Sequence, residues 1–161
     1  MSFKVESSIT INAPVAEVYD WMDHPHKHHD WQHSLLDTKV HEDNTFTVGR
    51  KFLGRRMETH FHDVERVPNK LLRRSGKGGT GVLMNYTVEQ RAEFEEVNGT
   101  TKVTITSDID TKGAMKAAVA KTMERVARNE LEANLKHLKE LVEAEDELHE
   151  VLGQLPRHNG A

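Results

Sequence analysis

Residues 121–150, KTMERVARNELEANLKHLKELVEAEDELHE, decide the fold because neither glycine nor proline interrupts them. Their apolar side chains recur at helical spacing, and the pattern extends upstream to Ala114 and downstream to Gly153. One stripe results, made of Met115, Val119, Met123, Val126, Leu131, Leu135, Leu138 and Val142. The pattern predicts one long C-terminal helix with a single apolar face, which must pack against another layer.

The residues before this helix have the period of β-strands. Residues 3–11 alternate apolar and polar side chains, and Pro14 then opens a short amphipathic helix. Six further strand-like runs follow, separated by turn signals. These runs are LLDTKV (35–40), TFTVGRKFL (45–53), RMETHFHDVERV (56–67), LLRRS (71–75), VLMNYTVEQRAEFEEV (82–97) and TKVTITSDID (101–110).

This order of elements predicts an α+β fold. Strands in succession with tight links form an antiparallel meander, and one apolar sheet face together with one apolar helix stripe requires the sheet to curve around the helix. We expect about seven strands, and two short helices after the first of them. The chain of 161 residues suits one domain over 1–152, followed by a flexible tail over 153–161.

Composition excludes several classes of function. The chain has no cysteine, so disulfides, thiolate nucleophiles and cysteine-bound metals are absent. A formal net charge of −4 argues against nucleic-acid binding. There is no apolar run long enough for stable membrane insertion and no signal peptide pattern at the start, so we expect a cytoplasmic protein. We predict neither a cofactor nor a bound metal.

Several motifs together resemble a known superfamily. They are ITINAPVAEVYDWMDHP followed by Trp31, VGRKF, DVERVPNKLLRR, NYTVEQ, NGTTKVTITSDID and ANLKHLKELVEA. From about Phe3 to Ala144 the chain resembles the START-like (SRPBCC) superfamily of helix-grip proteins, in particular its polyketide cyclase/dehydrase and lipid-transport-like branch. The resemblance implies a hydrophobic cavity between sheet and long helix. The resemblance does not identify catalytic residues in this chain, because the superfamily shares no catalytic motif.

The stretch DHPHKHHDW (23–31) and the two residues after it hold five histidines, a density that raises the question of a metal site. His29 and His33 would lie one helical turn apart, but a catalytic zinc site needs a third protein ligand and an open position. His60 and His62 are the available candidates for that ligand. We interpret the stretch as a solvated and pH-responsive loop at the cavity mouth.

Two glycine-containing motifs are predicted to be turns. GKGGTG (76–81) matches a dinucleotide fingerprint formally, but a strand follows it where that motif needs a helix to bind phosphate. We therefore interpret its glycines as a hairpin turn. Asn98-Gly99 is likewise predicted to connect two strands.

Apolar faces of the last two strands and of the long helix are the candidate ligand site. If these faces point inward they line a cavity, for which methionine side chains are well suited because they adapt to a ligand's shape. Trp31 is the candidate lid at the mouth. The full set of candidate ligand-binding residues is Trp31, Met84, Tyr86, Val103, Ile105, Met115, Val119 and Met123.

Catalytic candidates come from one strand. Glu58, His60 and His62 share one of its faces, while Met57 and Phe61 lie on the other. If the polar face points into an apolar cavity, desolvation shifts the pKa values toward those useful for proton transfer. We favour the opposite orientation, in which these three residues are on the surface.

Three classes of function fit these features. The leading hypothesis is binding of a hydrophobic or amphipathic small molecule, such as a lipid or polyketide, in the cavity. The second is an aromatase/cyclase- or dehydratase-type enzyme that uses the same cavity. The third is a protein-interaction module of the chaperone-activator type, because basic residues predominate over 50–77 and acidic residues over 124–150. A homodimer through the long helix or an edge strand is also open.

Overall fold

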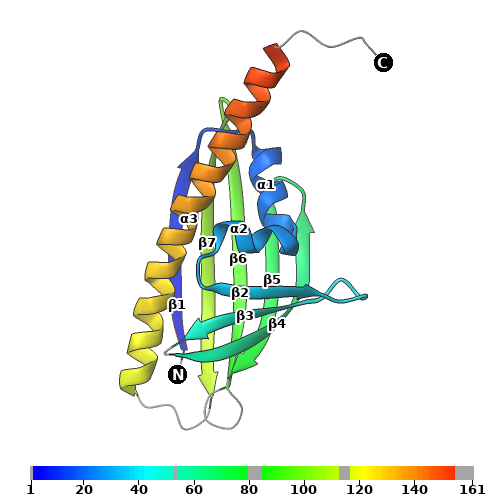
Figure 1. Ribbon diagram of the computed structural model, residues 1–161. Helices are drawn as coiled ribbons and strands as arrows, with labels where there is room; N and C mark the ends of the chain where they lie inside the picture. The colour runs from blue at the N-terminus through cyan, green and yellow to red at the C-terminus, as the bar shows by residue number, and fades with distance from the viewer. Residues whose placement is uncertain (1, 53, 80–84, 113–116, 155–161) are drawn as a thin grey trace.

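A computed structural model describes residues 2–52, 54–79, 85–112 and 117–154. One antiparallel sheet in the order β1-β7-β6-β5-β4-β3-β2 curves around the long helix α3 (Figure 1). The strands are β1 (Ser2–Ile11), β2 (Leu35–Val40), β3 (Phe46–Phe52), β4 (Arg55–Val67), β5 (Leu71–Gly79), β6 (Asn85–Val97) and β7 (Thr100–Lys112). The predicted helix-grip fold, with seven strands in a curved sheet, is confirmed.

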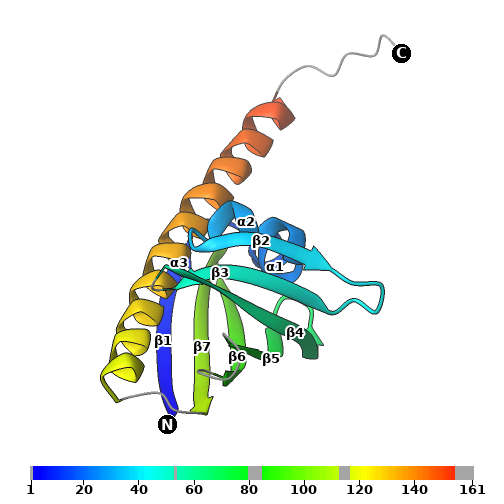
Figure 2. The same ribbon diagram turned by 60° about the horizontal axis from the view of Figure 1, so that its bottom comes forward.

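Short helices connect β1 to β2. Helix α1 (Val15–Asp23) starts directly after Pro14, as expected for a residue whose missing N–H costs nothing there. A 3-10 turn, η1 (Pro25–Lys27), leads into the four-residue helix α2 (His28–Trp31). Figure 2 shows these helices beside α3, next to β2. The prediction of two short helices after the first strand is confirmed, with the 3-10 turn as an additional element.

Helix α3 (Ala117–Gln154) runs across the concave side of the sheet and packs against β1. Its buried stripe includes Met123, Leu135, Leu138 and Val142, at the predicted helical spacing. The helix continues through Gly153 and ends at Gln154, two residues beyond the predicted boundary at 152. Among the described residues, nothing lies within 4 Å of a Cβ atom placed on Gly153. The last turns of α3 project beyond the sheet (Figures 1 and 2).

The core consists of two clusters of buried side chains. The first joins α1, the inner face of β7 and the middle of α3, and includes Val18, Val103 and Leu138. The second joins β3, β4 and β6 to the start of α3, and includes Phe61 and Met123. The two clusters meet along the concave face of the sheet, and this meeting region is where the cavity described below lies.

The glycines over 76–79 belong to strand β5, which corrects the prediction that they form a hairpin turn; the residues after Gly79 lie outside the described chain until Asn85. Two of these glycines, Gly76 and Gly78, make room for an aromatic ring. A Cβ atom on Gly76 would lie 2.7 Å from the Phe61 ring, and one on Gly78 would lie 2.7 Å from the Tyr86 hydroxyl. By contrast, Asn98 and Gly99 have φ values of 54° and 78° and form the predicted turn between β6 and β7.

Candidate functional site

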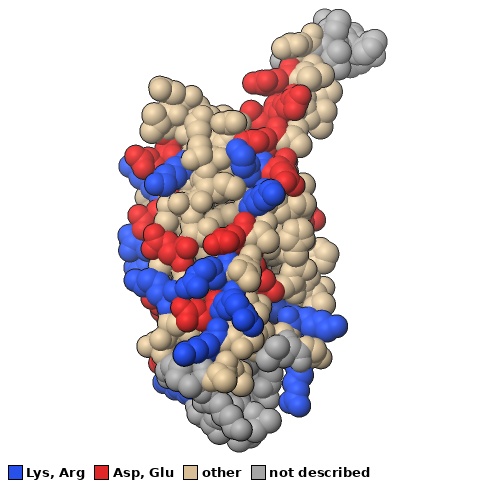
Figure 3. All heavy atoms as spheres, turned by 90° about the vertical axis from the view of Figure 1, so that its left-hand side faces the viewer, with Lys and Arg blue, Asp and Glu red and all other residues tan. Residues whose placement is uncertain are grey.

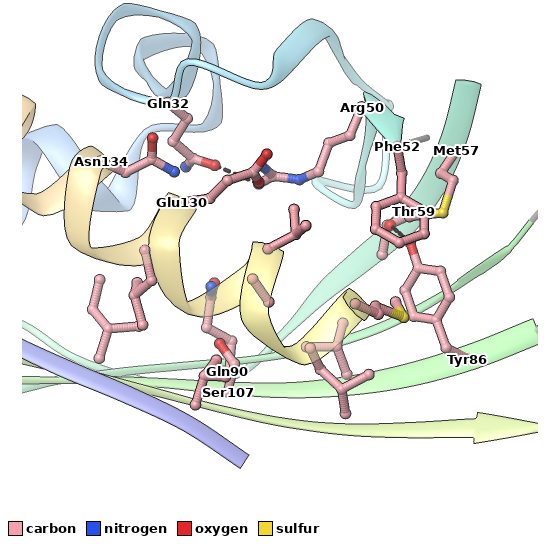
Figure 4. A pocket seen from close by; sticks show the side chains of 18 of the residues that line it. Gln32, Arg50, Phe52, Met57, Thr59, Tyr86, Gln90, Ser107, Glu130 and Asn134 are labelled. Atoms are coloured by element: carbon pink, nitrogen blue, oxygen red, sulfur yellow. Dashed lines mark hydrogen bonds between the residues drawn. The ribbon is translucent and has the colours of Figure 1, made fainter. Parts of the chain in front are cut away.

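A cavity of about 160 Å³ lies between the concave face of the sheet and the first half of α3 (Figure 4). This is well above the roughly 10–15 Å³ that one water molecule needs. Its apolar wall comes from strands β1, β3, β4, β6 and β7 and from helices α2 and α3. The apolar residues on this wall are Val5, Trp31, Phe52, Met57, Phe61, Tyr86, Val88, Ile105, Ile109, Met123, Val126, Ala127 and Leu131.

The strand register explains why these side chains reach the same space. Met57, Thr59 and Phe61 are buried on the inner face of β4, and Thr59 pairs with Gly78, which in turn pairs with Tyr86. Since Gly78 has no side chain, the Tyr86 ring lies over it, and the Tyr86 and Thr59 hydroxyls are hydrogen-bonded. Burial raises the pKa of Tyr86, so this hydroxyl stays protonated at neutral pH.

Polar side chains lie across the cavity from strands β6 and β7, namely those of Gln32, Arg50 and Glu130 (Figure 4). Together with Ser34, which is hydrogen-bonded to Arg50 and Glu130, they form what we call the polar roof. Arg50 on β3 donates to the Ser34 hydroxyl at 2.9 Å and to the Gln32 side-chain oxygen. Ser34 in turn donates to the Glu130 carboxylate on α3 at 2.9 Å. Figure 4 shows Gln32, Arg50 and Glu130 converging above the cavity. The polar roof therefore connects residues 23–34, which we call the mouth segment, to the sheet and to the long helix.

Arg50 brings a positive charge to a mostly apolar space. Burial lowers the pKa of its guanidinium, and the Glu130 carboxylate acts in the opposite direction. The hydrogen bonds that Arg50 makes within the described residues go to the neutral oxygens of Ser34 and Gln32. A guanidinium has five N–H donors, so donors remain for an oxygen of a bound molecule.

Further polar groups lie on the sheet side of the cavity. Gln90 on β6 and Ser107 on β7 are partners in the strand register, and both side chains line the cavity (Figure 4). They can donate to or accept from a polar group near the middle of a ligand. The cavity thus offers an apolar wall with hydrogen-bonding groups on two opposite sides, which is the arrangement typical of a small-molecule site.

One histidine of the mouth segment is buried, which corrects the interpretation of the whole stretch as solvated. The ring of His28 packs edge-on against Trp31 and Phe46, with centroids 5.8 and 5.7 Å apart. Its Nε2–H donates to the carbonyl oxygen of Met22 at 2.9 Å. Burial, with the charge of Arg74 as the second cause, lowers the pKa of His28 to about 3. His28 is therefore neutral at physiological pH.

Arg74 links the start of the mouth segment to the sheet through hydrogen bonds. Its side chain, from the inner face of β5, donates to the carbonyl oxygens of Met22 at 3.0 Å and Asp23 at 2.8 Å. It also donates to the Asp63 carboxylate at 2.9 Å and lies over the Phe46 ring, 5.0 Å from its centroid. These contacts hold the end of α1 in place, and with it the chain that leads to Trp31 and the polar roof.

Among the other histidines of this stretch, His24 and His26 lie edge-on to one another, with ring centroids 5.4 Å apart. The Nδ1 atom of His24 lies 3.2 Å from the Oδ1 atom of Asp20. The ring of His33 packs against that of His137 on α3, with centroids 4.7 Å apart. Within the described parts of the chain, no group of three or more His, Asp or Glu side chains converges so that it could hold a metal ion. The described residues therefore give no support to the metal hypothesis for His29, His33 and the β4 histidines.

The predicted site residues fall into four groups. Trp31, Tyr86, Ile105 and Met123 line the cavity. Val103 is fully buried in the first core cluster, and Val119 is half-buried; neither is part of the cavity wall, because the cavity occupies only part of the concave face. Met84 and Met115 lie outside the described residues. Glu58, His60 and His62 are exposed on the outer face of β4, so they do not reach the cavity.

Sequence reasoning missed the polar residues of the cavity, although a signal for some of them exists. In FTVGRKF (46–52), Arg50 occupies the same alternate position as Phe46, Val48 and Phe52, which face inward. A polar residue in register with apolar inward positions is therefore the signal that identifies Arg50. Gln90, between Val88 and Ala92 on the inner face of β6, shows the same pattern.

Comparison with known proteins agrees with this geometry. The profile of the family described as "Polyketide cyclase / dehydrase and lipid transport" matches residues 2–143. The chain belongs to this family. A search of curated proteins found no match. This family member resembles the Zhui aromatase/cyclase from Streptomyces sp. R1128, with a TM-score of 0.77 and 13% identity over 89% of this chain and 94% of that one.

Two further solved structures share the fold with this polyketide cyclase/dehydrase family member. A conserved protein from Geobacillus kaustophilus has a TM-score of 0.76 at 12% identity, covering 87% of this chain and 95% of that one. A START superfamily protein from Mycobacterium smegmatis has a TM-score of 0.64 at 12% identity, covering 90% and 97%. Within the described residues, no helix is both long and apolar enough to cross a membrane.

The close approach at Gly78 predicts a test of the cavity wall. A Cβ atom at this position would lie 2.3 Å from the carbonyl oxygen of Glu58, a backbone atom that cannot move freely. We expect Gly78→Ala to lower the free energy of unfolding by about 1–3 kcal/mol, measured by urea denaturation. Gly153→Ala is the control: no described residue lies within 4 Å of a Cβ atom there, so we expect no loss. Equal losses in both variants would contradict the packing described for Tyr86.

Proposed function

We propose that this family member binds an amphipathic small molecule, with the molecule's apolar body in the cavity and an anionic or hydrogen-bond-accepting oxygen against Arg50. The observation that carries the proposal is the position of Arg50, a positively charged side chain, in the polar roof of a mostly apolar cavity. A planar aromatic acid, or an oxygenated polyketide or lipid of similar size, has this distribution of groups. Gln90 and Ser107 lie where a second oxygen along its length would be bound.

The expected contributions are of two kinds. Apolar area removed from water contributes roughly 25 cal/mol per Å², which supplies affinity without selecting the ligand's polar end. A hydrogen bond to a charged group contributes about 1.5–3 kcal/mol, which corresponds to roughly a 10- to 100-fold change in Kd. The interaction with Arg50 is therefore the term that distinguishes an acid from a neutral molecule of the same shape.

A cyclase-type reaction is the second candidate, favoured by the hydrogen-bonded hydroxyls of Thr59 and Tyr86 on the cavity wall. A phenol that stays protonated can donate to a carbonyl oxygen of a bound chain, while Arg50 stabilises a developing enolate. Glu58, His60 and His62 have no part in this version, because they are exposed on the other face of β4. Loss of turnover in Tyr86→Phe with binding retained would favour this candidate.

The binding proposal is tested with three molecules of the same shape: 2-naphthoate, 2-naphthamide and 2-methylnaphthalene. By fluorescence titration we expect 2-naphthoate to bind about 10- to 100-fold more tightly than 2-methylnaphthalene, with the amide between them. In Arg50→Gln the preference for the acid should disappear while the hydrocarbon binds as before. Arg73→Gln is the matched control, since Arg73 is exposed on the same sheet and pairs with Glu65 at 3.6 Å.

Two results would contradict the proposal. The first is equal affinity of wild type for all three molecules, which would mean that Arg50 does not meet the ligand. The second is an equal loss of preference in Arg73→Gln, which would place the binding on the outer surface. Filling the cavity with Val88→Trp should abolish binding of all three molecules, because Val88 lies on the cavity wall.

A further inference from the structure

The last turns of α3 carry apolar side chains that the domain leaves uncovered. Leu148, Val151 and Leu152 are 55%, 51% and 53% exposed, where the helix projects beyond the sheet (Figures 1 and 2). These side chains point to a different side of the helix from the buried stripe. With 3.6 residues per turn, Leu148 lies about 120° around the helix from Val142, which is fully buried against the sheet. This is a second apolar face of α3, distinct from the one that forms the core.

The second face has the spacing of a coiled-coil seam. Leu141 and Leu148 are seven residues apart, and so are Ala144 and Val151. They occupy the a and d positions of two heptads, about 15 Å of helix in length. Leu141 is half-buried at the edge of the core, whereas Ala144, Leu148 and Val151 are exposed. The seam therefore begins at the domain surface and runs outward along the projecting helix.

Acidic residues flank this seam. Glu140, Glu145 and Glu147 stand at the e and g positions beside it, where a partner helix places its own charges. From Glu143 to Gln154 the chain has five acidic residues and no lysine or arginine. Figure 3 shows the acidic side chains gathered on the projecting end of the helix.

We propose that this acidic seam, formed by Leu141, Ala144, Leu148 and Val151 with its flanking glutamates, is the docking site for a basic amphipathic helix of a partner protein. The partner's apolar stripe packs between the leucines and valine, and lysines or arginines at its e and g positions pair with Glu140, Glu145 and Glu147. As in coiled coils, the charged residues beside the seam determine which helices can bind. Because the seam is short, we expect the complex to be reversible.

The same charges disfavour a second copy of this chain as the occupant. In a parallel pair of these helices Glu140 of one copy faces Glu145 of the other, and in an antiparallel pair the glutamates at g positions face one another. Like charges at these positions cost free energy in either orientation. A basic helix meets the same seam with opposite charges throughout.

The test uses the full chain and two synthetic 21-residue helical peptides with leucine at a and d, one with lysine and one with glutamate at e and g. By fluorescence anisotropy at low salt, we expect the lysine peptide to bind at least about tenfold more tightly than the glutamate peptide, and to weaken at 0.5 M salt. Leu148→Ser with Val151→Ser should abolish this binding. Val64→Ser, on the exposed face of β4, is the matched control and should leave it unchanged.

Reversing the charge of the three flanking glutamates distinguishes specific docking from non-specific binding. The variant Glu140→Lys, Glu145→Lys, Glu147→Lys should prefer the glutamate peptide. The proposal is overturned if wild type fails to bind the lysine peptide, if it binds both peptides equally, or if charge reversal does not exchange the preference. It is also overturned in favour of a homodimer if sedimentation shows that wild type self-associates and Leu148→Ser does not. All substituted side chains except half-buried Glu145 are exposed, and circular dichroism should show an unchanged fold.

Discussion

Replacing Arg74 with alanine is expected to lower the free energy of unfolding by about 3–5 kcal/mol, the range for removing one member of a buried ionic network. Arg74 is only 4% exposed. Its loss removes a hydrogen-bond donor from the carbonyl oxygens of Met22 and Asp23, although His28 still donates to Met22. The Asp63 carboxylate loses its closer arginine and keeps only the longer contact with Arg66, at 3.9 Å. The same change removes the cation lying over Phe46. We expect the mouth segment to separate from the sheet before the rest of the domain unfolds.

The neighbouring arginine is the matched control for this prediction. Arg73 points to the outer face, and its contact with Glu65 at 3.6 Å is between exposed side chains. Exposed pairs contribute about 0–1 kcal/mol, so Arg73→Ala should change stability little. Urea denaturation gives the free energies of unfolding, and hydrogen exchange at residues 23–34 shows whether the mouth segment opens first. Similar losses for the two variants would mean that Arg74 does not hold the segment.

Acid should destabilise the wild-type protein more than a His28→Gln variant. The pKa of His28 falls from its ordinary value of 6.5 to about 3 in the folded protein, mainly through burial. Unfolded chains therefore take up a proton at this residue below pH 6.5, whereas folded chains do not until near pH 3. Stability is lost as the pH falls through this window, by up to about 1.4 kcal/mol per pH unit.

The glutamine variant isolates this effect because its amide can still donate to the Met22 carbonyl but does not titrate. Between pH 6.5 and 4.5 we expect wild type to lose about 2–3 kcal/mol more than the variant, measured by denaturation at each pH. His26→Gln, at an exposed position, should show the same pH dependence as wild type. Parallel curves for wild type and His28→Gln would contradict the burial of this ring.

The layers of the fold could be predicted because their signals are local. The alternation in residues 3–11 and the stripe through Leu135 and Val142 depend only on spacing, and burial follows it. The boundaries of β5 could not be predicted, since Gly76 and Gly78 are strand residues only because Phe61 and Tyr86 fill the space above them. That information comes from strands far along the chain.

The candidate site was predictable in part. Tyr86 and Ile105 line the cavity. Their inward orientation could be predicted because apolar and polar residues alternate along each strand. Nothing near His28 distinguishes it from the histidines around it; its burial follows from the distant Arg74 and Phe46. The hydrogen-bonded polar roof was not predicted for a similar reason, since Arg50 and Glu130 are 80 positions apart and are joined through Ser34.

The central claim is that a small amphipathic molecule enters the cavity with its acidic end at Arg50. Nuclear Overhauser effects between bound 2-naphthoate and the methyl groups of a labelled protein test it most directly. We predict contacts from the ring protons to the methyl groups of Val88, Ile109 and Met123, which line the cavity, and loss of these contacts in Val88→Trp. Contacts confined to exposed methyl groups such as those of Leu36 and Val64 would place the ligand outside and contradict the account.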